Sequence, residues 1–346
     1  MNPILFAVVG CGHIGKRHAE MISRNEFAKL VGVVDTDENK IIDFRTEGTP
    51  VFNNVQEFIS KEILCDVVCI ATPNGTHIEI ALQLIEAGYH VVVEKPLGLD
   101  IQSSERLLFK ALEKQRMVFA VMQNRYSPPS KWLKEIVNSG VLGEIFLVQT
   151  NCFWNRDERY YKKESWHGDL HLDGGTLFTQ FSHFIDILFW VFGDVSNVQS
   201  KLADFNHGNL TEFEDSGVAM FDFVTGGVGT LSFSTSVWDS NLESSITVIA
   251  ENGSIKIGGQ YMNEVVHCHV KGYEMPVLPP TNPSNDYGPY KGSAANHNYV
   301  IENVVNVLNS NASITTNAFE GLKVVEIINK IYSAADRSKY IKTLSK

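Results

Sequence analysis

The sequence has few of the features that mark membrane proteins or disulfide-stabilised proteins. Its 346 residues contain no stretch near the roughly 18 consecutive apolar residues of a membrane-spanning helix. The N-terminus lacks the basic region and the small-residue cleavage site of a signal peptide. The five cysteines are irregularly spaced, which argues for reduced thiols rather than a disulfide framework. We therefore expect a cytoplasmic globular protein that does not enter a membrane.

Positive charge is also scarce. The chain has 29 Lys and Arg residues against 40 Asp and Glu, so its formal net charge is −11. An acidic surface repels the phosphates of nucleic acids and the headgroups of anionic membranes, so we expect neither as a partner. A small anionic ligand is compatible with this balance, because a cationic pocket can lie within a negative protein.

The first 120 residues alternate β-branched runs with segments whose apolar residues recur at helical spacing. The expected strands cover residues 4–9, 29–34, 66–70, 90–93 and 117–121, and the expected helices cover residues 14–24, 54–61, 77–86 and 101–114. This alternation predicts a doubly wound α/β domain with a parallel sheet over residues 1–122.

The pattern changes after residue 122. Expected helices cover residues 128–138, 176–192, 297–309 and 318–336, and expected strands cover residues 144–153, 218–224, 229–237, 245–250 and 254–257. Short turns such as Asn252-Gly253 join neighbouring strands, as in antiparallel hairpins. We predict a mainly antiparallel α+β domain over residues 123–346. A loop rich in Pro, Gly and Tyr covers residues 272–295, and its part around residues 279–290 either covers a site or is a disordered linker.

A glycine-rich motif, Gly10-Cys11-Gly12-His13-Ile14-Gly15, follows the first expected strand and opens the first expected helix. In a Rossmann fold the first glycine permits a tight turn, the second lets the backbone approach a pyrophosphate, and the third permits close helix packing. Asp35 lies about 20 residues further on, where an acid binds the adenosine ribose. Asp35-Thr36-Asp37 repels a 2′-phosphate, so we predict NAD rather than NADP. The alternative is a tight turn that binds nothing.

Further polar residues follow the later strands, where ligands of open α/β sheets bind. Thr72-Pro73-Asn74 with His77 ends one strand, and Glu94-Lys95-Pro96 follows the next. A lysine at such a strand end can help to remove the proton of a sugar hydroxyl as hydride leaves its carbon. The competing interpretations are a solvated loop lysine for Lys95 and a helix-start residue without chemistry for His77.

Together these motifs resemble those of the glucose–fructose oxidoreductase / inositol dehydrogenase (Gfo/Idh/MocA) family. The similarity rests on the glycine-rich turn, on Thr72-Pro73-Asn74 with His77, and on A-G-Y-H-V-V-V-E-K-P-L over residues 87–97. It continues through Gly174-Gly175, His183 and Asp186. The resemblance implies NAD(P)-dependent oxidation of a sugar, an inositol or a related alcohol. It also implies a second domain with a large open antiparallel sheet, a homodimer or homotetramer, and Lys95 and His183 as catalytic residues.

One position departs from the family pattern. Many relatives carry Asp four residues before the histidine, one helical turn away, where this chain has Thr179. A threonine can orient a hydroxyl but cannot act as a carboxylate base. Asp173 can replace the missing acid only if the loop before the helix folds back. The competing interpretation of His183 is a helix histidine packed among apolar neighbours.

Aromatic and cationic residues alternate over residues 154–163 and again around Trp166. Aromatic faces suit sugar rings and uracil, and arginine forks suit carboxylate and phosphate. The alternative is a solvated loop with local charge pairs. With Asn124-Arg125-Tyr126, this block resembles the branch of the family that oxidises UDP-N-acetylglucosaminuronic acid at C3 for bacterial surface polysaccharides. A 2-oxo acid such as 2-oxoglutarate is then a candidate for reoxidising NADH.

The rival functions are dehydrogenation of a free sugar or inositol and a non-catalytic NAD-binding sensor. The residues expected to contact NAD are Gly10, Gly12, His13, Ile14, Gly15, Asp35, Thr72, Pro73, Asn74, His77, Glu94, Lys95 and Gln123. The residues expected to contact substrate are Lys95, Asn124, Arg125, Arg156, Arg159, Tyr160, Trp166, Thr179 and His183. No metal site is expected, because His267-Cys268-His269 has no third ligand at a recognisable spacing.

Overall fold

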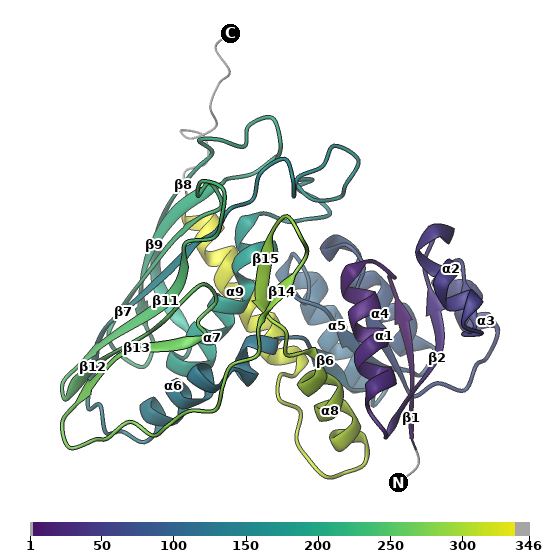
Figure 1. Cartoon of the computed structure of the whole chain (residues 1–346), viewed down its shortest axis with the longest axis horizontal. Coiled ribbons are helices and arrows are strands. Elements are labelled where there is room, and N and C mark those ends of the chain that lie inside the picture. The colour runs from purple at the N-terminus through teal and green to yellow at the C-terminus, as the bar shows by residue number, and fades with distance from the viewer. Residues whose placement is uncertain (1–2, 336–346) are drawn as a thin grey trace. The chain divides into compact units, whose positions relative to one another are not determined.

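The computed structural model describes residues 3–335, which divide into two compact units (Figure 1). The first unit consists of Met1–Met122 and His297–Val325, and the second begins at Gln123. The sequence predicts residues 297–325 in the second domain, but the structure groups them with the first. The reason is packing: α8 (His297–Leu308) lies against α1 (His13–Arg24), and Ala120 N donates to Thr316 O at 3.0 Å.

The first unit is built on a parallel sheet in the order β3-β2-β1-β4-β5-β6, drawn in purple and blue in Figure 1. Its strands are β1 (Ile4–Val9), β2 (Ala28–Val34), β3 (Val51–Phe52), β4 (Val67–Ile70), β5 (His90–Val93) and β6 (Val118–Ala120). Every residue of β4 is buried, as expected for a parallel sheet that is covered on both faces. The strand order reverses beside β1, which is where open α/β sheets bind ligands.

Helices connect these strands, and each of the four predicted helices is present to within one residue at either end. Besides α1 they are α2 (Glu38–Thr46), α3 (Val55–Ser60), η1 (Asn74–Thr76), α4 (His77–Glu86) and α5 (Ile101–Glu113). Asp100 is the N-cap of α5, and its side chain accepts a hydrogen bond from Ser103 N at 2.8 Å. The sequence does not predict α2, because Ile41 is its one buried residue and no apolar periodicity marks it.

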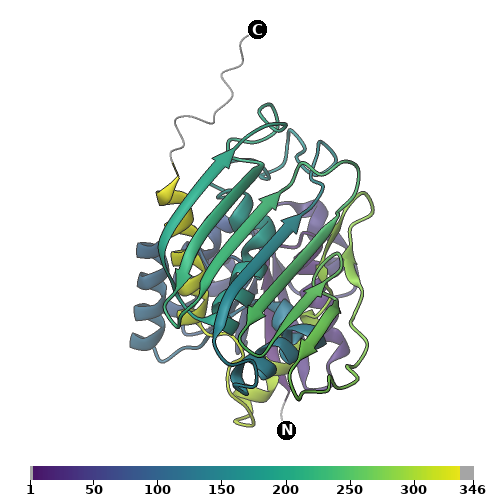
Figure 2. The ribbon, with the colours of Figure 1, turned by 90° about the vertical axis from the view of Figure 1, so that its left-hand side faces the viewer.

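The second unit is built on a sheet in the order β13-β12-β11-β7-β10-β9-β8, which faces the viewer in Figure 2. Its strands are β7 (Ile145–Phe153), β8 (Val195–Ala203), β9 (Ser216–Phe223), β10 (Val228–Ser234), β11 (Glu243–Ala250), β12 (Gly253–Gly258) and β13 (Glu264–Val270). The β10–β7 pair is parallel and the other neighbours are antiparallel. The parallel pair is possible because the chain makes a long crossover between its two strands.

The remaining elements of the second unit lie around this sheet. They are η2 (Gln123–Tyr126), α6 (Pro128–Asn138), the π-helical turn η3 (Leu177–Phe181), α7 (Ser182–Phe192), the hairpin β14 (Ser284–Asp286) and β15 (Lys291–Ala294). The hairpin lies within the loop that the sequence leaves open as a cover or a linker. Helix α9 (Ala318–Ala334) spans both units, and residue 336 of the predicted helix lies outside the described residues. Within residues 3–335 no helix is long and apolar enough to cross a membrane.

Candidate active site

The glycine-rich turn after β1 combines close packing with open space. A Cβ at Gly15 would lie 1.7 Å from the Gly10 carbonyl oxygen, so α1 packs directly on the turn. A Cβ at Gly12 would meet nothing within 4 Å, and Gly12 caps α1 without a side-chain hydrogen bond. Backbone N–H groups at a helix start beside open space bind anions. This turn therefore fits the pyrophosphate of a dinucleotide.

Asp35 follows β2 and braces this turn from the other side. Its carboxylate accepts hydrogen bonds from Cys11 N at 2.7 Å and from Asp37 N at 2.9 Å. Lys40 Nζ, on α2, lies 4.0 Å from Asp35 Oδ1 and is half exposed. Two carboxylates at this strand end suit the ribose diol of NAD and oppose a 2′-phosphate. The residues present therefore fit NAD.

The strand ends of β4 and β5 are tied together by a buried histidine. His77 Nδ1 lies 2.8 Å from Pro96 O, and His77 Nε2 lies 2.9 Å from Thr72 O. Burial, opposed by these two contacts, lowers the pKa of His77. A neutral ring donates to one of the two carbonyl groups. His77 thus packs between the Thr72 and Pro96 turns and donates a hydrogen bond to one of them, while its predicted contact with NAD stays a prediction.

Lys95 lies two residues after the end of β5, and its peptide bond to Pro96 is cis. The preceding Glu94 is buried, and its carboxylate accepts hydrogen bonds from protein groups on both oxygens. The sequence predicts that Glu94 contacts NAD. The structure instead directs its carboxylate to His18, His297 and the backbone of Lys95.

In the second unit, the loop before α7 folds back onto the position where the sequence departs from the family. The Thr179 hydroxyl donates to the Asp173 carboxylate, and Asp173 Oδ2 accepts from Gly168 N at 2.8 Å. Asp173 is fully buried, and His183 on α7 is 3% exposed. The loop before α7 therefore folds back as the replacement of the family acid by Asp173 requires. The π-helical turn η3, which holds Thr179, is a feature often found at functional sites.

Arg125 forms a buried ion pair, and its predicted contact with substrate stays a prediction. The sequence predicts it as a substrate ligand, but its Nε lies 2.8 Å from Asp186 Oδ2 and its NH2 lies 2.6 Å from Asp186 Oδ1. This bidentate pair is fully buried and joins η2 to α7. Next to it, the Asn124 amide is buried and has no hydrogen-bond partner among residues 3–335, and Gln123 Oε1 has none either. The predicted contacts of Asn124 with substrate and of Gln123 with NAD stay predictions.

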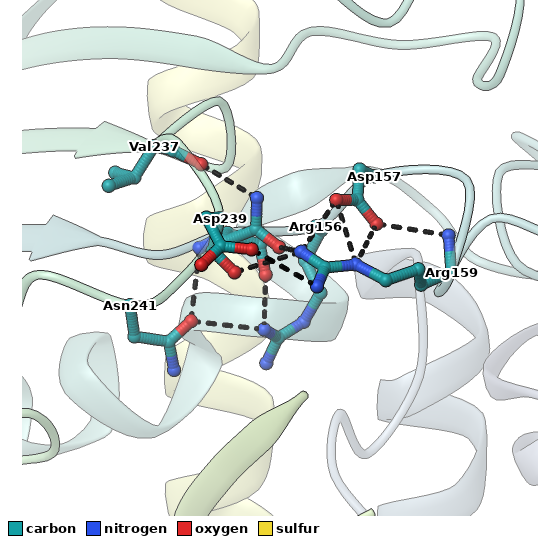
Figure 3. Close-up of polar contacts among 7 residues, drawn as sticks. Arg156, Asp157, Arg159, Val237, Asp239 and Asn241 are labelled. Carbon is teal, nitrogen blue, oxygen red and sulfur yellow. Dashed lines mark hydrogen bonds and ion pairs between the residues drawn. The ribbon is translucent and has the colours of Figure 1, made fainter. Parts of the chain in front are cut away.

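Arg156 and Arg159 lie close in the chain but differ in their partners, as Figure 3 shows. Arg159 is 36% exposed, and its guanidinium pairs with the Asp157 and Asp239 carboxylates. Arg156 is buried and donates from Nε to Gln180 Oε1 at 2.7 Å and from NH1 to Asn241 Oδ1 at 3.2 Å. The positive charge of Arg159 is therefore compensated by the carboxylates of two nearby residues.

The charge of Arg156 has no such compensation. Its acceptors in the described part of the chain are all neutral, and they include the Lys291 carbonyl at 2.9 Å. The rings of Trp154, Tyr160 and Tyr290 lie 4.8, 5.3 and 5.1 Å from the guanidinium carbon. Burial lowers the pKa of Arg156, but a guanidinium keeps its proton at neutral pH. A buried cation without a carboxylate is a place where an anion is stabilised.

An aromatic cluster extends from this cation. Tyr160 contacts the rings of His167 and Tyr290 at 4.3 and 5.0 Å, and Trp166 stacks on His167 at 4.1 Å. Sequence reasoning predicts Tyr160 and Trp166 but misses Tyr290, which the β14–β15 hairpin brings into the cluster. Tyr290 belongs to no motif, and the sequence points to it only through the loop around residues 279–290 that is a candidate cover of the site.

Both units match known protein families. Residues 4–122 match the oxidoreductase family with an NAD-binding Rossmann fold, and residues 131–256 match the Gfo/Idh/MocA C-terminal domain. The chain belongs to the Gfo/Idh/MocA family. This Gfo/Idh/MocA protein is therefore an NAD-dependent oxidoreductase that acts on sugar-type substrates. The fold class, the enzyme class and the NAD cofactor predicted from the sequence are confirmed.

Solved structures and curated relatives add detail to the family assignment. WlbA dehydrogenases from Bordetella pertussis and Chromobacterium violaceum, each in complex with NADH and UDP-GlcNAcA, both match with a TM-score of 0.85. They are 28% and 27% identical to this Gfo/Idh/MocA protein, over 96% of its chain and 96% and 94% of theirs. Glucose-6-phosphate 3-dehydrogenase of Bacillus subtilis is 29% identical over 221 residues, which is 62% of this chain and 61% of that protein.

Proposed function

We propose that the protein uses NAD to oxidise C3 of a UDP-N-acetyl amino-sugar uronate in the synthesis of bacterial surface polysaccharide. The observation that carries the proposal is the likeness, over 96% of the chain, to two dehydrogenases that bind NADH and UDP-GlcNAcA. The buried, uncompensated charge of Arg156 supports it, because this substrate carries a carboxylate and a diphosphate. We also propose that the enzyme is cytoplasmic, because all five cysteines are unpaired.

The proposed mechanism assigns each group one task. Bound NAD supplies the hydride acceptor. The turn at Gly12 binds the pyrophosphate, and Asp35 binds the ribose. Lys95 donates a hydrogen bond to the substrate hydroxyl, and His183 takes its proton as hydride leaves the same carbon, so that the alcohol becomes a ketone. The Asp173–Thr179 pair stands in for the acid that the family carries one turn before the histidine.

We propose that a second copy of the chain covers the open face of the second sheet. Val218, Met220, Val228 and Ile249 on this sheet are 40–54% exposed. A large apolar sheet face is rarely left in water. We expect a dimer or tetramer by light scattering. A variant carrying Val218→Lys and Met220→Lys should be shifted toward the monomer.

The test of the activity is the appearance of NADH absorbance with UDP-sugars, free sugars and inositols, with and without 2-oxoglutarate. The proposal predicts that UDP-N-acetylglucosaminuronic acid reduces NAD most efficiently. Turnover confined to a free sugar or an inositol supports the alternative dehydrogenase. NAD binding without turnover on any substrate, even with the 2-oxo acid present, supports the sensor.

A further inference from the structure

Two histidines far apart in the sequence meet one carboxylate inside the first unit. His18 on α1 and His297 at the start of α8 place their Nε2 atoms 2.8 and 3.1 Å from Glu94 Oε1. The side chains of His18, Glu94 and His297 are 0, 8 and 1% exposed. The two imidazole rings meet edge to face, with their centroids 5.3 Å apart. The proposed reaction gives neither histidine a task.

Two histidines and a carboxylate are also a zinc-ligand set, and these three ligand atoms lie within 4.8 Å of one another. A metal-bound histidine, however, normally donates its second ring nitrogen to a carboxylate, a carbonyl group or water. Here Nδ1 of both His18 and His297 is buried without a carboxylate, carbonyl or water partner among residues 3–335, although the Cys69 thiol lies near His18. The short distances to Glu94 are those of hydrogen bonds. The cluster is therefore a hydrogen-bonded triad in which each ring donates Nε2–H.

The charges within the triad support this interpretation. Burial opposes ionisation of Glu94, but hydrogen bonds from His18 and His297 hold its pKa well below the usual value. Burial lowers the pKa of His297. Burial alone would also lower the pKa of His18, but its contacts with Cys69 and Glu94 raise it to about 10. These directions agree with a Glu94 carboxylate that accepts a hydrogen bond from each of the two rings.

The other oxygen of Glu94 faces the residue to which we assign catalysis. Glu94 Oε2 accepts a hydrogen bond from Lys95 N at 3.2 Å, and Glu94 N donates to Ile70 O on β4 at 3.0 Å. On the far side of Lys95, Pro96 O lies 2.8 Å from His77 Nδ1. Buried histidines thus brace the backbone both before and after Lys95. Such bracing affects the rate because a misplacement of about 1 Å costs about 100-fold in turnover.

We propose that His18, Glu94 and His297 form a triad that positions Lys95 for hydride transfer. The triad touches no reacting atom, so its members are positioning residues. The proposal rests on the proposed dehydrogenase function, because Lys95 acts in that reaction. His18 lies on the helix that begins at the glycine-rich turn, so the triad also ties the pyrophosphate-binding helix to the strand end that carries Lys95.

The first experiment separates positioning from binding. Glu94→Gln keeps the size of the side chain but removes the charge and one acceptor. We expect kcat to fall about 30- to 100-fold, while the KM for the sugar and the Kd for NADH change by less than about twofold. His90→Gln, at the opposite end of β5, is the matched control and should leave kcat unchanged.

Two substitutions of His18 distinguish a loss of positioning from a general loss of structure. His18→Gln keeps an N–H at the position of Nε2 and should retain kcat within about threefold, whereas His18→Leu should lose about as much as Glu94→Gln. If Glu94→Gln fails to fold, the comparison of kcat between His18→Gln and His18→Leu tests the proposal instead. Equal rates for His18→Gln and His18→Leu, or wild-type kcat in Glu94→Gln, would overturn the positioning role.

A second experiment needs no substrate. Nitrogen NMR of protein with isotope-labelled histidine should find Nε2 of His18 and His297 protonated, and elemental analysis should find no stoichiometric metal. Protonation at Nδ1 alone, or one bound metal ion per chain, would overturn the triad. If no sugar reduces NAD, the proposed function fails while these spectra still decide the triad. If wild type turns over but Glu94→Gln is equally fast, the positioning proposal fails and the dehydrogenase stands.

Discussion

The two units present their functional groups in different ways. In the first, the glycine-rich turn is one contiguous stretch, and its chemistry comes from backbone N–H groups at the start of α1. In the second, the surroundings of Arg156 come from segments that include Gln180, Asn241 and Lys291. A site built from backbone N–H groups needs glycines at fixed positions, so it can be recognised as a motif in the sequence. A cluster of side chains that tertiary contacts bring together has no fixed spacing in the sequence. The site of the first unit can therefore be predicted from the sequence much better than that of the second.

The largest expected effect tests the lysine that follows β5. Lys95→Ala should lower kcat about 1,000-fold, because the substrate hydroxyl loses the cationic hydrogen-bond donor that stabilises its oxygen as the proton leaves. NADH absorbance at saturating substrate measures it. Lys16→Ala, an exposed lysine on α1, is the control and should turn over normally. A Lys95→Ala rate near that of wild type would contradict the assigned role.

The next effect compares two arginines of the second unit. Arg125→Met breaks the buried pair with Asp186 and should lower the free energy of unfolding by about 3–5 kcal/mol, because an uncompensated buried charge is left behind. Arg159→Met removes a partly exposed pair and should leave stability nearly unchanged. Urea denaturation followed by fluorescence measures both. Equal stability losses would show that Arg125 is not the structural residue that its contacts indicate.

Two glycines of the same turn should respond differently. Gly15→Ala forces a Cβ against the Gly10 carbonyl and should weaken NAD binding about 100-fold or unfold the turn, because a displacement of about 1 Å in a packed site costs that much. Gly12→Ala meets no protein atom within 4 Å, so the protein should fold and melt normally but bind NAD about tenfold more weakly. Calorimetric titration with NADH, beside thermal melting, tests the contrast. Unchanged NAD affinity in Gly12→Ala would place the pyrophosphate elsewhere.

The smallest effect concerns the position where the family acid is absent. Thr179→Val removes the hydroxyl that donates to Asp173 and should lower kcat about tenfold, as expected for loss of one hydrogen bond to a charged group. Thr179→Ser keeps the hydroxyl and should stay within about twofold of wild type. Identical kcat values for the two variants would remove Thr179 from the proton path.

Much of the fold is predictable because it rests on local patterns. The strands Ile4–Val9 and His90–Val93 and the helices His77–Glu86 and Pro128–Asn138 begin and end at the predicted residues. Strand β8 is not predicted, because Asn197 has a positive φ within a register shift that interrupts its alternation. The parallel β10–β7 pair is not predicted, because turn motifs indicate only the pairing of strands that are neighbours in the sequence.

The features that the sequence does not predict depend on side chains that are far apart in the chain. An amphipathic helix has an apolar stripe but does not specify its partner, so the packing of α8 on α1 is not predictable from residues 297–308. Glu94 and His297 lie 203 residues apart, and their contact has no spacing that a motif could record. The pairing of Arg125 with Asp186 is missed for the same reason, although both residues stand out in the sequence as charged groups near predicted site residues.

The most direct test of the proposed reaction follows the hydrogen on the oxidised carbon. UDP-N-acetylglucosaminuronic acid carrying deuterium at C3 is incubated with the enzyme and NAD, and the reduced cofactor is analysed by mass spectrometry. We expect one deuterium in each NADH formed and a 3-keto sugar nucleotide as the product. Unlabelled NADH, or no NADH from this substrate while another sugar reduces NAD, would contradict the proposed reaction.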